Sequence, residues 1–107
     1  MKTIKSKPTG LAGKRAKALA EKFRDNPTAI ADYLTDAFSS GDAAQIAKAI
    51  GDMVHAQGMS RFSRKSGLGR ENLYRIFDGT KNPKLETVIK ALNALDIQLE
   101  ATPSAGS

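Results

Sequence analysis

Apolar residues recur every three or four positions along most of this chain, which is the spacing of amphipathic helices. One such stretch spans 27–38. It follows Asn26, a residue that caps helix starts, and it opens on a proline, which is preorganised for the first helical position. The next stretch spans 42–57, opens on the capping residue Asp42 and is closed by Gly58. The pattern therefore predicts two consecutive amphipathic helices.

Between residues 59 and 78 the apolar pattern breaks into two short runs separated by Gly67-Leu68-Gly69. Two helices this short cannot each bury a face alone, and they fit best as a helix-turn-helix, in which they cross steeply around a tight turn. Ser63 is small where the helices would touch, Gly67 stands where a left-handed backbone costs least, and Leu73 fills the crossing. This pattern resembles the helix-turn-helix of phage repressors and Cro, with Ser63 in place of the usual alanine. The serine fits there if its hydroxyl finds a backbone carbonyl.

A turn cluster follows over 79–83, and after it a final helix with a long apolar stripe. Either Asn82 or Lys84 caps this helix, and Asp96 ends it. The stripe consists of Leu85, Val88, Ile89, Leu92 and Leu95. The chain as a whole is therefore predicted to be all-α, a small helical bundle that contains a Cro/repressor-type helix-turn-helix.

A switch to alternating apolar residues over 97–101 predicts a short C-terminal strand. No second strand is evident in the sequence, and a lone strand leaves its backbone groups unpaired. Pairing with the same strand of a second copy, through Ile97 and Leu99, would satisfy those groups and favours a homodimer. The alternative is an extended tail packed on the helices. Residues 103–107 are expected to form a disordered tail.

The net charge of +6 is unevenly distributed along the chain. Residues 1–26 hold eight Lys or Arg and two Asp or Glu, whereas residues 27–107 hold nine of each. Within that neutral part, residues 61–84 hold seven basic and two acidic residues, and the flanks 27–60 and 85–107 come to −3 and −2. A basic patch thus falls on the helix-turn-helix, where phosphate contacts would be needed. The alternative is scattered surface charge that serves solubility.

In a helix-turn-helix the second helix enters the major groove with its N-terminal residues at the base edges. Arg suits guanine and Glu can accept from the cytosine amino group, although Glu71 is equally explained as a helical i,i+4 partner of Arg75. The predicted base-reading residues are Arg70, Glu71, Asn72, Tyr74 and Arg75. The predicted phosphate contacts, which fix register without reading sequence, are Ser60, Arg61, Arg64, Lys65, Gly69 and Lys81.

Composition argues against several other classes of protein. The chain has no Cys and one His, which excludes disulfides and thiolate metal sites and leaves little for a transition-metal site. No apolar run approaches membrane-spanning length and no secretion signal is evident, so a cytoplasmic protein without a membrane partner is expected. An enzyme is not expected, because His55 stands apart from any nucleophile and GLGREN lacks the spacing and the preceding strand of a phosphate loop. We therefore expect no catalytic residue, no metal and no cofactor.

Residues 1–25 are expected to form a basic arm, flexible or conditionally helical, in front of a helix-turn-helix domain over 26–102. A weak helical stripe runs over 14–24, and three interpretations of it stay open. It is a helix docked on the domain or on a partner, an arm on the DNA backbone, or a helix on a membrane surface. The stripe is mostly alanine, so membrane binding is the weakest of the three, and a partner-binding or conditionally ordered segment is favoured.

From about residue 29 to about residue 102 the chain resembles the antidote (antitoxin) proteins of bacterial toxin–antitoxin addiction modules, HigA-like members of the Xre/Cro superfamily. The matching stretches are IADYLTDAFSSGD, AKAIGDMVHAQGMSRFSRKSGLGRENLYRIFDG and NPKLETVIKALNALDIQLEA. The resemblance implies a bundle of about five helices, dimeric binding to double-stranded DNA of its own operator, and neutralisation of a RelE-like mRNA-cleaving toxin encoded beside it. It does not reach the basic N-terminal segment. The alternatives are a stand-alone Xre-family transcriptional regulator without a toxin partner and, more distantly, an adaptor that binds no DNA.

Overall fold

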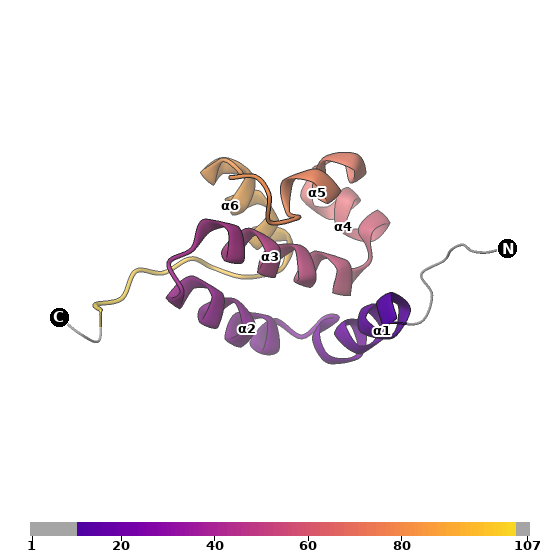
Figure 1. Cartoon of the computed structure of the whole chain (residues 1–107), viewed down its shortest axis with the longest axis horizontal. Helices are drawn as coiled ribbons and strands as arrows, with labels where there is room; N and C mark the ends of the chain where they lie inside the picture. Colours follow the sequence, from indigo (N-terminus) through magenta and orange to yellow (C-terminus); the bar gives the residue numbers. More distant parts are fainter. Residues whose placement is uncertain (1–10, 105–107) are drawn as a thin grey trace, which may run out of the picture.

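The computed structural model describes residues 11–104, with side chains described from residue 17. Within these residues the chain forms six α-helices and no strand (Figure 1). The helices are α1 (Leu11–Phe23), α2 (Pro27–Ser39), α3 (Ala43–Gln57), α4 (Met59–Ser66), α5 (Arg70–Ile76) and α6 (Leu85–Ala94). The predictions for residues 1–10 and 105–107, the start of the basic arm and the end of the tail, lie outside the described residues.

Helix α3 is the centre of the bundle. It contacts each of the other five helices, and Figure 1 shows α1 and α2 along one side of it and α4, α5 and α6 along the other. The largest fully buried side chains are Phe62, Ile30, Leu34, Ile50, Met53, Leu73, Leu92 and Val54. The predicted all-α bundle is confirmed: five helices, α2 to α6, lie in the range of the resemblance, and α1 precedes it.

The predicted starts of α2 and α3 are confirmed by capping hydrogen bonds. The Asn26 side chain accepts from the backbone N–H of Ala29 at 3.3 Å, and the Asp42 carboxylate accepts from the backbone N–H of Ala44 at 2.9 Å. Gly58, at φ 90°, closes α3 as the sequence predicts. These side chains bond N–H groups that a helix cannot satisfy internally, so local sequence fixes where both helices begin.

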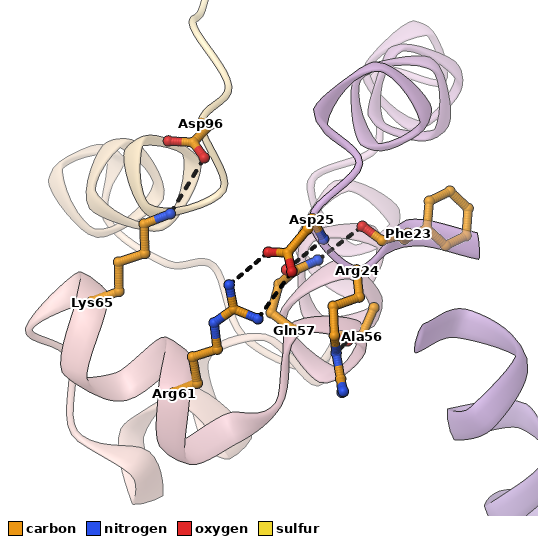
Figure 2. Close-up of polar contacts among 8 residues, drawn as sticks. All are labelled: Phe23, Arg24, Asp25, Ala56, Gln57, Arg61, Lys65 and Asp96. Atoms are coloured by element: carbon orange, nitrogen blue, oxygen red, sulfur yellow. Dashed lines mark hydrogen bonds and ion pairs between the residues drawn. The ribbon is translucent and has the colours of Figure 1, made fainter. Parts of the chain in front are cut away.

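The junction after α1 is fastened to the end of α3. The Phe23 side chain is buried, and its ring lies edge-on to Tyr33 with centroids 5.2 Å apart. Arg24 Nε donates to the carbonyl of Ala56 at 2.8 Å, and Gln57 Nε2 donates to the carbonyl of Phe23 at 3.1 Å (Figure 2). Both carbonyls stand at helix ends, where they lack partners within their own helix. The described part of the N-terminal segment therefore lies against the domain.

The C-terminal segment has no regular secondary structure after α6. Lys84, the second of the two predicted caps, precedes α6 but makes no side-chain capping bond, and the chain leaves the helix through Asp96 at φ 62°. The predicted strand over 97–101 is not formed within this chain, because no described strand lies beside it to pair with. The segment instead runs past α2 (Figure 1), and side chains of both line a hollow.

Gly51 in the middle of α3 determines how closely the end of α5 can approach. A Cβ atom added at this position would overlap the backbone carbonyl oxygen of Phe77, the residue that caps α5. Gly51 is itself buried. A missing side chain on α3 thus sets the position of α5 against the core.

Candidate nucleic-acid interface

The turn between α4 and α5 has the local geometry that the sequence pattern requires. Helix α4 ends at Gly67, whose φ of 77° is left-handed. Ser63 Oγ donates to the backbone carbonyl of Leu68 at 2.7 Å, which is the kind of bond the serine needs at a half-buried position. Leu73 is 2% exposed and belongs to the core. The predicted break, the left-handed glycine and the serine bond are all present.

Helix α5 turns one face to the core and the other to solvent. Leu73 and Phe77 are buried and Ile76 is half-buried. The predicted base-reading residues, all exposed, are Arg70, Glu71, Asn72, Tyr74 and Arg75. The buried leucine and phenylalanine orient the helix, so its exposed polar side chains are available to a partner.

Each arginine of α5 makes one exposed side-chain hydrogen bond to another described residue. Arg70 Nη1 donates to Ser60 Oγ at 3.2 Å, and Arg75 Nη2 donates to Asn72 Oδ1 at 3.4 Å. Among the described residues no ion pair joins Glu71 to Arg75. The bond of Arg75 is longer than usual, and each guanidinium keeps further N–H donors for another acceptor.

Tyr74 lies against the one histidine of the chain. Its ring is tilted against that of His55 on α3, with centroids 5.6 Å apart, and the Tyr74 side chain is 48% exposed. The sequence indicates only an ordinary surface histidine at this position, and His55 is indeed exposed. Its proximity to a predicted base-reading residue comes from the packing of α5 on α3, for which the sequence carries no local signal.

The predicted phosphate contacts also lie on the surface. All six are exposed: Ser60, Arg61, Arg64, Lys65, Gly69 and Lys81. Two of the six are paired with carboxylates (Figure 2). Arg61 Nη2 lies 2.6 Å from Asp25 Oδ1, and Lys65 Nζ lies 3.3 Å from Asp96 Oδ2. Neither carboxylate is predictable as a partner from the sequence, because each comes from a segment more than thirty residues away along the chain.

The pair of Asp25 and Arg61 is ionised and open to solvent. The hydrogen bond from Arg61 holds the pKa of the Asp25 carboxyl below its ordinary value, and the same bond raises the pKa of Arg61. The two side chains are 63% and 50% exposed. Exposed ion pairs of this kind contribute little free energy, because solvent and salt screen the charges.

A second turn, after α5, carries Lys81. The Asp78 carboxylate accepts from both the hydroxyl of Thr80 at 2.6 Å and its backbone N–H at 2.8 Å. Both bonds lower the pKa of the Asp78 carboxyl, and the bond from the Thr80 hydroxyl has the larger effect. Gly79 between them has φ 90°. Lys81 and Arg64 form no ion pair within the described part of the chain, so both cations face solvent.

The residues predicted to form a dimer strand divide between the core and the surface. Ile97 is half-buried and packs against the core, whereas Leu99 is 46% exposed. Leu99 lines a small hollow together with Ile89 of α6, and Leu85, one helical turn earlier, is 68% exposed. Part of the apolar stripe predicted for α6 thus faces solvent.

Two kinds of feature are absent from the described residues. They contain no group of three or more His, Cys, Asp or Glu side chains placed to hold a metal ion. None of their helices has both the length and the apolar character needed to span a membrane.

The fold and its surface define a small all-helical protein with cationic side chains gathered on one pair of short helices. The model of a family described as probable addiction module antidote proteins matches residues 16–103, and the chain belongs to this family. A protein of Haemophilus influenzae (strain ATCC 51907 / DSM 11121 / KW20 / Rd), described as uncharacterized, is 36% identical over 72 residues, which cover 67% of this chain and 74% of that protein. No solved structure matches the chain significantly. Membership of an antidote family implies a toxin as partner.

Proposed function

We propose that this protein is the sequence-specific DNA-binding antitoxin of a type II toxin–antitoxin module. In this proposal it neutralises a RelE-like mRNA-cleaving toxin encoded beside it and represses its own operon. Helices α4 and α5 act as an Xre/Cro-type, HigA-like helix-turn-helix on double-stranded operator DNA. The protein acts in the cytoplasm, by binding and without catalysis.

The observation that carries the DNA part of the proposal is the exposed polar face of α5. Arg70 and Arg75 face solvent while Leu73 anchors the same helix in the core. A helix held in this way can enter a major groove with its arginines at guanine edges. Glu71 in the first turn can accept from a cytosine amino group.

The surrounding cations supply contacts that do not depend on sequence. Arg64 at the end of α4 and Lys81 in the turn after α5 lie on either side of α5 along the chain, and both are exposed. Cations on each side of a reading helix contact phosphates and fix its register on the duplex.

The proposed roles are tested by binding of the full chain to the DNA upstream of its own gene. Arg70→Ala or Arg75→Ala should relax the preference at particular base pairs and weaken binding by about 1–3 kcal/mol. Lys81→Ala should weaken binding to all sequences alike and flatten the salt dependence by about one unit. Lys90→Ala on α6, where the lysine pairs only loosely with Glu86 at 3.8 Å, is the control for the loss of one charge. Identical behaviour of the three test variants would contradict the assignment of roles.

We further propose that the protein binds as a homodimer, with the segment 97–101 pairing as a strand with that of a second copy. The exposure of Leu99 beside Ile89 supports this, because a second copy would cover both side chains. Sedimentation velocity should therefore give a dimer for the wild type and a monomer for Leu99→Lys. Gln45→Lys on α3 introduces the same charge at an exposed position that lines neither of the hollows lined by Leu99, and should leave the dimer intact. A dimer that survives Leu99→Lys would contradict this interface.

Two alternatives are separated from the antitoxin by simple observations. A stand-alone Xre-family regulator has no toxin partner, so copurification with the product of a neighbouring RelE-like reading frame distinguishes the antitoxin from it. An adaptor that binds no DNA shows no salt-dependent binding to the promoter fragment. The antitoxin is preferred because the family match spans residues 16–103.

A further inference from the structure

Two aspartates hold an unusual backbone conformation at corresponding places in the fold. Among the described residues, Asp25 at φ 55° and Asp96 at φ 62° are the non-glycine residues with positive φ. Each lies two residues beyond a helix, Asp25 after α1 and Asp96 after α6. Glycine is the usual residue at such left-handed positions, and asparagine and aspartate are the non-glycine residues that adopt them most readily, because their short polar side chains can bond locally. The backbone therefore accounts for a short polar side chain at each place, but asparagine would serve it as well, so it does not account for the negative charge.

Both carboxylates are directed at the same helix (Figure 2). Asp25 accepts hydrogen bonds from Nη1 and Nη2 of Arg61, at 3.4 and 2.6 Å, and Asp96 accepts from Lys65 Nζ at 3.3 Å. Arg61 and Lys65 are one helical turn apart and lie on one face of α4. Two segments far apart in the chain thus each place a negative charge on a cation of α4.

Other hydrogen bonds already hold both segments in place. The chain at Asp96 is held by bonds from its own backbone N–H to the carbonyl of Asn93 at 3.0 Å and from the N–H of Ile97 to the carbonyl of Leu92 at 2.9 Å. The junction at Asp25 is already fastened by bonds from Arg24 to the carbonyl of Ala56 and from Gln57 to the carbonyl of Phe23. Asp25 itself contributes its backbone N–H to Gln57 Oε1 at 3.2 Å, a bond that asparagine or glycine would keep. Solvent-exposed ion pairs add little to stability. The charge of the carboxylate therefore calls for another role.

We propose that Asp25 and Asp96 compete with the DNA backbone for Arg61 and Lys65, and so hold down the affinity of the protein for DNA of any sequence. This inference rests on the proposed function. A carboxylate and a phosphodiester each offer anionic oxygens to the same N–H donors, so a phosphate must displace the aspartate or lie beside a like charge. The pairs are exposed by about half or more of each side chain, so phosphate can reach them.

If the aspartates compete with phosphate, removing their charge should tighten DNA binding. Asp25→Asn and Asp96→Asn keep the size and the left-handed backbone preference of the residue but remove the charge. Each should tighten binding to a random duplex and to the promoter fragment alike, by about two- to tenfold near 0.1 M salt, and steepen the logarithmic salt slope by about one unit. Asp32→Asn on the exposed face of α2 changes the net charge equally, and should have a clearly smaller effect because Asp32 pairs with no described cation.

The measurement is fluorescence anisotropy of labelled duplexes with the full chain over a series of salt concentrations. Binding by Asp25→Asn and Asp96→Asn that matches Asp32→Asn would overturn the competition. Weaker binding would also overturn it, and would show instead that the carboxylates orient the cations toward phosphate. Asp25→Gly and Asp96→Gly, which also relieve the backbone strain, provide folded variants without the charge if the asparagine forms unfold. A wild type that binds neither duplex at low salt contradicts the proposed function, whereas failure of the aspartate variants alone contradicts only this inference.

Discussion

At the scale of single residues, Ser63 shows how a polar side chain is accommodated where two helices meet. Its hydroxyl donates to the carbonyl of Leu68, so the serine brings its own hydrogen bond into a half-buried position. The bond spans the turn at Gly67, and it also ties the end of α4 to the chain that enters α5. We infer that the position requires mainly a small side chain, and that the hydrogen bond of the hydroxyl is a secondary requirement.

This ranking predicts the effect of two substitutions on stability. Ser63→Ala keeps the size and should change the free energy of unfolding by no more than about 1 kcal/mol, because solvent can reach the Leu68 carbonyl. Ser63→Leu adds bulk between the helices and should lower it by about 1–3 kcal/mol. Urea unfolding followed by circular dichroism measures both. Arg64→Leu adds the same side chain on the exposed face of α4, and a Ser63→Leu protein as stable as this control would contradict the account.

Residue-scale features were predictable from sequence where the cause is local. Asn26 and Asp42 cap helices whose first N–H groups lie two or three residues away, and Gly67 supplies a left-handed turn that its own backbone permits. The pairing of Arg61 with Asp25 could not be predicted, because 36 residues separate them and their contact depends on how α1 docks. No Asp or Glu stands three or four residues from Arg61 in the sequence, so nothing local indicates that its charge is paired.

At the scale of elements, the fit of α5 against α3 depends on Gly51. Glycine inside a helix is usually destabilising, and its replacement by alanine usually raises the free energy of unfolding by about 1 kcal/mol. Here the added methyl group would overlap the Phe77 carbonyl oxygen, a backbone atom that can move only if the end of α5 moves. Steric overlap therefore opposes helix propensity at this position.

We predict that the overlap outweighs the gain in propensity. Gly51→Ala should lower the free energy of unfolding by about 1–3 kcal/mol, as expected when a close-packed contact is overfilled. Thermal unfolding followed by circular dichroism gives the measurement. Gly69→Ala is the matched control, because its φ is −61° and its added Cβ would meet only the Asn72 side chain at 3.5 Å. A Gly51→Ala protein more stable than the wild type would show that α5 has room to move.

The sequence predicted the central elements better than the terminal ones, for physical reasons. Helices α2 to α6 have strong apolar faces or capping residues, whereas the stripe before residue 24 is mostly alanine and leaves several interpretations open. Besides the buried Phe23, α1 is fastened by the bond from Arg24 to a backbone carbonyl of α3, a contact that no apolar period encodes. The alternation over 97–101 predicts a strand, but a strand needs a partner, and no described segment of the chain provides one.

At the scale of the whole molecule, the distribution of charge connects the fold to the proposed function. Residues 61–84 carry a net charge of +5 in a part of the chain that is otherwise acidic, and the fold exposes every basic residue predicted to contact DNA. Counting charges along the sequence predicted this patch. The charge count could not predict that Asp25 and Asp96, which lie outside residues 61–84, form ion pairs with Arg61 and Lys65 of the patch.

The most direct test of the account is the binding of the full chain to its own promoter fragment and to a shuffled duplex as salt is raised. The account predicts tight binding at low ionic strength and a preference for the promoter of about a thousandfold or more. It also predicts an affinity that falls at least about tenfold between 50 and 200 mM salt. The preference should be lost when Arg70 and Arg75 are both replaced by alanine. Equal affinity for the two duplexes, or no binding to either at low ionic strength, would contradict the claim that α5 reads DNA.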